Sequence, residues 1–99
     1  MTKTFSFSAK VWLYPGAAAW HFASVDEKTT EEIDSYFKDF KHGFGSLPVS
    51  ATVGKTTWKT SIFPDSKTNT YLLPLKKDVR QKEKINEGDK INIKLEIHD

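Results

Sequence analysis

The 99-residue sequence contains no cysteine, which excludes a disulfide-stabilised scaffold, a thiolate nucleophile and a zinc site built on sulfur. The absence also suits a reducing cytoplasm. No apolar run approaches the roughly 20 residues of a membrane-spanning helix. Residues 1–7 lack the charged start and apolar run of a signal peptide. We therefore expect a soluble, cytoplasmic protein that makes no contact with a membrane.

Net charge and aliphatic residues are also scarce. The 15 basic and 13 acidic side chains leave a net charge of +2, too small to indicate a nucleic-acid partner by itself. Hydrophobic residues make up only 37% of the chain, but aromatic residues make up 13%. Because each aromatic side chain buries roughly 150–250 Å², the chain can still build a core. We expect that core to be rich in rings, within a single domain over residues 1–99.

Apolar residues alternate with polar ones in several short segments, which is the period of a β-strand. Residues 49–53 and 57–63 flank Gly54-Lys55 and predict a hairpin. Trp20 is expected to lie in the core. The expected strands are residues 5–13, 20–25, 49–53, 57–63, 70–73 and 91–97.

One segment changes to the helical period. Its apolar residues lie at i, i+3, i+4 and i+7, so they share one stripe of a helix that we expect to face the core: Ile33, Tyr36, Phe37 and Phe40. Thr29 followed by Glu32 fits a capping box at the N-terminus of this helix. Gly43 can provide the left-handed residue that ends it. We expect an amphipathic helix over residues 30–41.

These elements predict a mainly β fold: a small closed β-barrel of about six strands with one inserted amphipathic helix. A closed barrel is favoured over an open sheet because closure removes exposed strand edges. A short helical turn is expected within residues 75–84, ahead of the last strand, with Leu75 and Val79 facing inward. Periodicity does not predict the order of the strands.

Six short motifs occur in a characteristic order along the chain, at residues 12–16, 19–22, 45–49, 58–64, 71–80 and 88–90. Together they resemble the bacterial family known as the domain of unknown function 1905. The resemblance covers roughly residues 4–97 and implies a small closed β-barrel with an inserted helix. It implies no established activity and no catalytic residues.

The C-terminal third carries a weaker, local likeness. Residues 73–80, Ile85 and residues 88–91 combine a proline-led short helix, a Gly-Asp turn and a strand. This combination resembles AbrB/MazE-type swapped-hairpin transcription factors, which bind DNA as dimers. The rest of the chain departs from their pattern, so the likeness implies shared local architecture.

Two tryptophans are conspicuous on their strands. Trp12 and Trp58 each interrupt what is otherwise read as a polar face. Flat apolar side chains of this kind commonly line ligand pockets. The alternative is that they fill a core that is short of aliphatic residues.

Basic and hydroxyl side chains complete the predicted site. Residues 76–84 carry five positive and two negative charges. Lys76 and Arg80 would suit an anionic group, because guanidinium binds carboxylate or phosphate through two parallel hydrogen bonds. Thr60 and Ser61 would supply hydroxyls nearby. The alternative is an ordinary solvated surface.

We therefore predict a module that binds a small molecule or a protein partner, with a preference for anions and no catalytic activity. No cofactor is expected, and the module is expected to be a monomer or weak homodimer. The candidate ligand-binding residues are Trp12, Trp58, Thr60, Ser61, Lys76 and Arg80.

Two other functions remain open from the sequence. Residues 76–84 could bind nucleic acid, with Trp12 or Trp58 stacking on bases. A hydrolase would need His21 or His42 to activate a hydroxyl of residues 57–61. No nucleophile elbow supports the hydrolase.

No metal site is expected. The three histidines are His21, His42 and His98, and none is paired with another at i+2 or i+4. No cluster of carboxylates has the spacing of metal ligands either.

Overall fold

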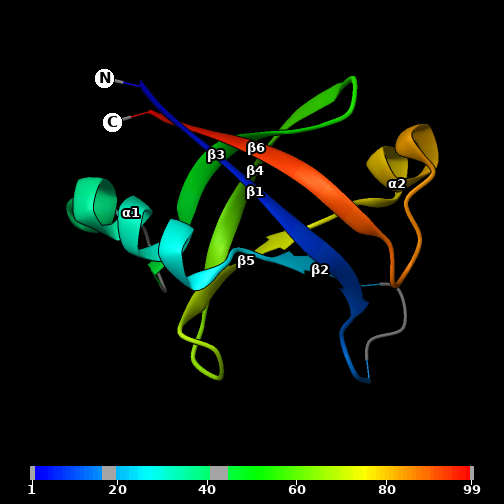
Figure 1. Cartoon of the computed structure of the whole chain (residues 1–99), viewed down its shortest axis with the longest axis horizontal. Coiled ribbons are helices and arrows are strands. Elements are labelled where there is room, and N and C mark those ends of the chain that lie inside the picture. Colours follow the sequence, from blue (N-terminus) through cyan, green and yellow to red (C-terminus); the bar gives the residue numbers. More distant parts are fainter. Residues whose placement is uncertain (1, 17–19, 41–44, 99) are drawn as a thin grey trace.

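The computed structural model describes residues 2–16, 20–40 and 45–98. In this part of the chain, six antiparallel strands close into a barrel in the order β1-β2-β5-β4-β3-β6 (Figure 1). The predicted closed barrel of about six strands is confirmed. The strands are β1 (Thr2–Leu13), β2 (His21–Ser24), β3 (Leu47–Val53), β4 (Thr56–Asp65), β5 (Thr70–Pro74) and β6 (Lys90–His98); the helices are α1 (Glu27–Phe37), the 3-10 turn η1 (Lys38–Phe40) and α2 (Lys77–Glu83).

β1 is long enough to join both halves of the barrel. It pairs with β6 from Thr2 to Lys10 and with β2 from Val11 to Leu13. Its period of two places Phe5, Phe7 and Val11 in the core, as predicted. Because one continuous strand bends from β6 to β2, the sheet closes on itself without a free edge at this point.

The hairpin predicted around Gly54 is confirmed. Val53 pairs with Thr56, which leaves Gly54 and Lys55 as a two-residue turn. Gly54 has φ +59° at the first central position, as a type II′ turn requires. This turn matches the right-handed twist of the two strands that it joins.

The core combines aliphatic residues with a few rings. Phe37 and Tyr71 are almost fully buried, and the Tyr71 hydroxyl donates a hydrogen bond to Asp34 of α1. Two sequence-based placements are wrong. Trp20 is 58% exposed and Tyr36 is 51% exposed. Trp20 precedes β2 on the outer side of the barrel, and Tyr36 lies at the solvent edge of the helical stripe, beside Lys3.

α1 begins earlier than predicted. Asp26 is its N-cap residue, and the Asp26 carboxylate accepts a hydrogen bond from the backbone N–H of Thr29 (2.7 Å). Thr29 is therefore inside the first turn, and the proposed capping box is wrong, because an extended Asp placed three residues earlier already fulfils that function. α1 ends at Phe37 and continues as η1. The predicted helix end at residue 41 and cap at Gly43 lie outside the described residues.

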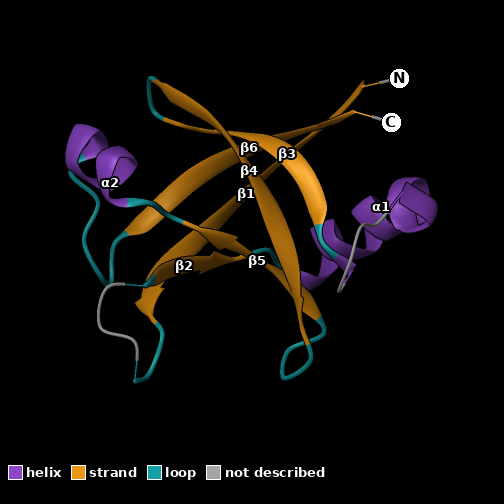
Figure 2. Cartoon of the chain, turned by 180° about the vertical axis from the view of Figure 1, so that it is seen from behind, coloured by secondary structure: helices purple, strands orange, loops and turns teal. Residues whose placement is uncertain are grey.

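α1 and α2 lie at opposite sides of the barrel (Figures 1 and 2). The predicted short helix before the last strand is confirmed as α2, with Leu75 and Val79 each 2% exposed. Lys84 ends α2 in the left-handed conformation. None of the described helices is long and apolar enough to cross a membrane.

Candidate functional site

A pocket of about 380 Å³ opens where β4 and β5 separate. The ladder between these strands covers only Phe63–Asp65 and Thr70–Leu72, and the chain then leaves β5 for α2. The resulting gap lies between the middle of β4, the end of β5, the first turns of α2 and the start of β2. We call it the seam pocket; it is lined by Trp20, His21, Trp58, Lys59, Thr60, Pro74, Leu75, Lys76, Lys77 and Arg80.

Strand alternation points two β4 side chains into the seam pocket. Trp58 pairs with Ala51, and Thr60 pairs with Val49; both partners are buried. Trp58 therefore belongs to the inward face of β4, and the sequence-based assignment to a polar face is wrong. Its ring is only 7% exposed, so it serves as core and as pocket wall at once.

β2 and α2 are tied together at the opposite wall. The backbone N–H of Leu75 donates to the carbonyl of His21 (2.9 Å). The Arg80 Nε–H donates to the carbonyl of Leu75 (3.0 Å), which orients the guanidinium at the pocket. Because the Leu75 side chain is buried, the backbone to which Arg80 bonds is held in place by the core.

α2 is held against the hairpin by a polar contact as well as by its core residue. The Thr56 hydroxyl donates to Glu83 Oε2 (2.6 Å), at the far end of the helix from Lys77. Val79 packs into the core between these ends. The helix that carries Arg80 is thus held at several points along its length, which limits how far the guanidinium can move.

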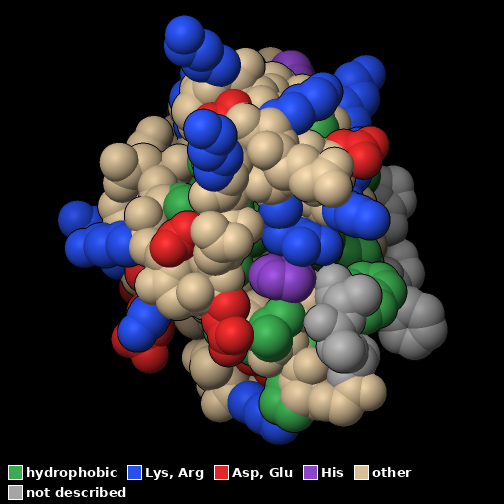
Figure 3. Space-filling model, turned by 90° about the vertical axis from the view of Figure 1, so that its right-hand side faces the viewer, with side chains coloured by type: hydrophobic (Ala, Val, Ile, Leu, Met, Phe, Trp, Pro, Cys, Tyr) green, Lys and Arg blue, Asp and Glu red, His purple; other side chains and the backbone are tan. Residues whose placement is uncertain are grey.

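The seam pocket is positively charged. Lys59, Lys76, Lys77 and Arg80 line it, and no Asp or Glu is among its ten lining residues. Figure 3 shows the side of the molecule that carries α2, where Lys and Arg side chains gather around a histidine next to hydrophobic side chains. Several cations beside apolar rings favour binding of an anion that also has an apolar or flat part.

Four of the six predicted site residues line the seam pocket together: Trp58, Thr60, Lys76 and Arg80. Ser61 is not among the lining residues; it pairs with Pro48 of β3. Trp12 lies on the outer face of β1, where its Nε1–H donates to the Ser24 hydroxyl (3.0 Å).

Sequence reasoning missed several residues of the pocket wall: Trp20, His21, Lys59 and Lys77. Lys77 adjoins the predicted Lys76, and its position at the start of a short helix is a usable signal. Trp20 and His21 reach the pocket only because β2 neighbours β5 in the barrel. That adjacency was not predictable from periodicity.

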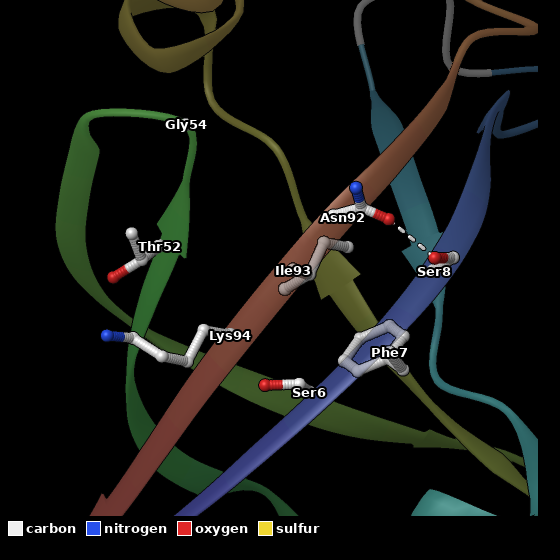
Figure 4. Close-up of a pocket in the computed structure, with 8 residues that line it drawn as sticks. All are labelled: Ser6, Phe7, Ser8, Thr52, Gly54, Asn92, Ile93 and Lys94. Atoms are coloured by element: carbon white, nitrogen blue, oxygen red, sulfur yellow. Dashed lines mark hydrogen bonds between the residues drawn. The ribbon is translucent and has the colours of Figure 1, made fainter.

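A larger cavity of about 510 Å³ lies on the outer side of β1 and β6, beside the β3–β4 hairpin (Figure 4). It is more open than the seam pocket. Lys94 is the only charged side chain that lines it, and two of its polar groups already bond to each other: the Ser8 hydroxyl donates to Asn92 Oδ1 (2.6 Å). It therefore presents fewer groups for recognition than the seam pocket does.

Of the hydroxyls considered for a hydrolase, Thr60 lines the seam pocket together with His21, whereas Ser61 does not, and His42 lies outside the described residues. Over residues 2–16, 20–40 and 45–98 there is no group of three or more His, Cys, Asp or Glu side chains able to hold a metal ion.

Comparison with known proteins places the chain in a family. A search of curated proteins found no match. The family model described as "Domain of unknown function (DUF1905)" matches residues 7–95. This match covers most of the chain, including all of the seam-pocket residues, and the small barrel fits the expected fold. The chain therefore belongs to the DUF1905 family of small β-barrel domains.

Proposed function

We propose that this barrel is a binding module without catalytic activity, and that the seam pocket binds an anionic ligand with an apolar or flat portion. One observation carries the proposal: four cationic side chains and two tryptophans line a single pocket that has no carboxylate among its lining residues. A carboxylate or phosphate would lie near Lys76 and Arg80, and the apolar portion would contact the wall formed by Trp58.

The guanidinium supports this orientation of the ligand. Arg80 uses its Nε–H on the Leu75 carbonyl. Its two terminal nitrogens are not part of that bond, and together they present the fork that matches two oxygens of one anion. Thr60, whose side chain is half-buried on the β4 wall, offers a hydroxyl to the same group.

We further propose that the module acts in the cytoplasm, as a monomer or weak homodimer. The absence of cysteine in the chain suits a reducing compartment. Sedimentation velocity over a range of protein concentrations measures the oligomeric state.

The test is an NMR titration of the isotopically labelled protein with matched pairs of probes: benzoate against benzyl alcohol, and adenosine monophosphate against adenosine. We expect the anionic member of each pair to shift backbone resonances around Thr60 and Lys76, and the neutral member to bind more weakly. Loss of a charge-assisted hydrogen bond costs about 1.5–3 kcal/mol. Arg80→Gln should therefore weaken binding about 10- to 150-fold, and Arg80→Lys should weaken it less.

Lys28→Gln is the matched control, because Lys28 is an exposed lysine on α1, at the other side of the barrel. It removes one positive charge without touching the seam pocket. If neutral and anionic probes bind equally, or if Lys28→Gln weakens binding as much as Arg80→Gln does, the proposal is wrong.

A further inference from the structure

Four aromatic rings gather on the outer face of β1 and β2, next to the seam pocket. Trp12 pairs with Phe22 across the two strands, and the backbone N–H of Tyr14 donates to the carbonyl of Trp20 (3.0 Å). Phe22 lies at the centre, with ring centroids 5.3 Å from Trp12, 6.0 Å from Tyr14 and 6.0 Å from Trp20. We call this group the aromatic face.

The aromatic face departs from the usual pattern of an antiparallel sheet, in which the outer face is polar. Trp20 is 58% exposed and Tyr14 is 49% exposed. Trp20 stacks on Phe22 with an interplanar angle of 24° and still keeps more than half of its surface exposed. Contiguous exposed apolar surface of this kind marks an interaction site.

The aromatic face and the seam pocket are continuous. Trp20 belongs to both, and Phe22 pairs with Pro74, which is itself a lining residue of the pocket. A ligand that enters the pocket beside Lys76 and Arg80 can therefore continue over Trp20 onto Phe22 and Tyr14 without crossing a charged carboxylate of the pocket wall. The combined surface therefore joins the basic residues of the pocket to four aromatic rings.

We propose that this combined surface binds single-stranded nucleic acid, with phosphates at the basic residues of the seam pocket and unpaired bases stacked on Trp20 and Tyr14. The inference rests on the proposed function, since it names the ligand class of the same pocket. Single strands present a chain of flat rings joined by anionic links, and proteins bind them by combining a basic groove with exposed aromatic side chains. A duplex keeps its bases stacked inside, so it cannot use the aromatic face.

The primary measurement is fluorescence anisotropy of a labelled single strand of about ten deoxythymidines, a length within the range bound by other small barrels. We expect saturable binding at low salt. Each phosphate contact in a single strand contributes about −0.7 to the slope of log K against log salt, so contacts from four cations predict a slope of about −2 to −3. Lys77→Gln should reduce the magnitude of that slope by about 0.7.

The decisive variant is Trp20→Leu, which keeps an apolar side chain and removes the ring. Loss of one stacking platform should weaken binding about 5- to 150-fold. Tyr36→Ala is the matched control, because Tyr36 is a similarly exposed ring on α1 and should leave binding unchanged. Because Trp20 is exposed, Trp20→Leu should fold; circular dichroism and the melting temperature check this.

Three outcomes would overturn the assignment: equal binding of a duplex of the same length, an unchanged affinity in Trp20→Leu, or tighter binding of an acidic peptide that alternates Glu with Phe. Self-association that Trp20→Leu abolishes would likewise assign the aromatic face to a second copy of the chain. If adenosine monophosphate binds the seam pocket and the single strand does not bind, this inference fails and the proposed function stands. If benzoate, adenosine monophosphate and the single strand all fail to bind, both proposals fail.

Discussion

Glu83 packs against Gly54, and the effect of substitutions at both positions on the free energy of unfolding can be predicted. A Cβ built on Gly54 would overlap Glu83 Oε1 and lie 2.9 Å from Glu83 Cδ, at a φ of +59°. Gly54→Ala should therefore do two things at once. It places an L-residue in a strained conformation, which costs about 1–3 kcal/mol. It also pushes the Glu83 carboxylate away from the Thr56 hydroxyl that it accepts from.

The hydrogen bond from Thr56 to the Glu83 carboxylate is charge-assisted and is expected to contribute about 1.5–3 kcal/mol. Gly54→Ala should then lower the free energy of unfolding by about 2.5–6 kcal/mol in total. Glu83→Ala should cost only the hydrogen bond. In the Glu83→Ala background, Gly54→Ala should cost only the backbone strain, because the collision has been removed.

Urea denaturation of the four proteins in this cycle measures the coupling. We expect the double variant to be as stable as Gly54→Ala alone, within about 0.5 kcal/mol. Lys55→Ala, at the neighbouring turn position, is the control and should change stability by no more than about 0.5 kcal/mol. If the effects of Gly54→Ala and Glu83→Ala add, the two residues do not interact as described and the reasoning is refuted.

Three further predictions concern single positions. Thr30 is 6% exposed and its hydroxyl has no hydrogen-bond partner. Thr30→Val should therefore raise the melting temperature, by about 4–8 °C for each kcal/mol gained, and Thr30→Ser should lower it. A lower melting temperature for Thr30→Val would show that the hydroxyl is not a destabilising buried group. Asp26→Ala should lower the free energy of unfolding, measured by urea denaturation, by about 1 kcal/mol because it removes the α1 N-cap. Asp26→Ser keeps a capping side chain and should lose much less stability. Equal losses for the two variants would argue against capping by Asp26. Trp58→Ala should lower the free energy of unfolding by about 3–5 kcal/mol because the ring belongs to the core, and Trp58→Phe should lower it less. Calorimetry compares the two variants. A Trp58→Ala variant as stable as the original protein would show that the ring is not needed for packing.

The period of the hydrophobic residues predicted most of the elements because burial on one side imposes alternation directly on the sequence. β6 is the clearest case: Ile93, Leu95 and Ile97 are buried at every second position. The hairpin turn at Gly54 was also predictable, since few residues other than glycine tolerate its φ. Closure of the strands into a barrel followed from the number of short strands and from the cost of exposed edges.

The pattern of polar and apolar residues gave the wrong face for two tryptophans, because tertiary contacts decide whether they face the core or the solvent. Trp20 is the type of residue expected in a core and yet is 58% exposed, because it stacks on the outward-facing ring of Phe22. Trp58 was singled out as an anomaly on a polar face, whereas its pairing with Ala51 turns it inward. A period of two cannot say which face of a short strand is inside when both faces carry apolar residues.

The sequence by itself therefore determined most of the strands, the two helices and the cluster of cations at and next to a short helix, which includes Lys76 and Arg80. It overstated the share of rings in the core, which is mostly aliphatic. Only the tertiary structure decided that these cations share a pocket with Trp58 and Trp20. The physical reason is that strand order depends on long-range pairing: β2 lies beside β5, and β5 separates from β4 after Leu72. The pocket forms at that separation, between segments that are distant in the chain.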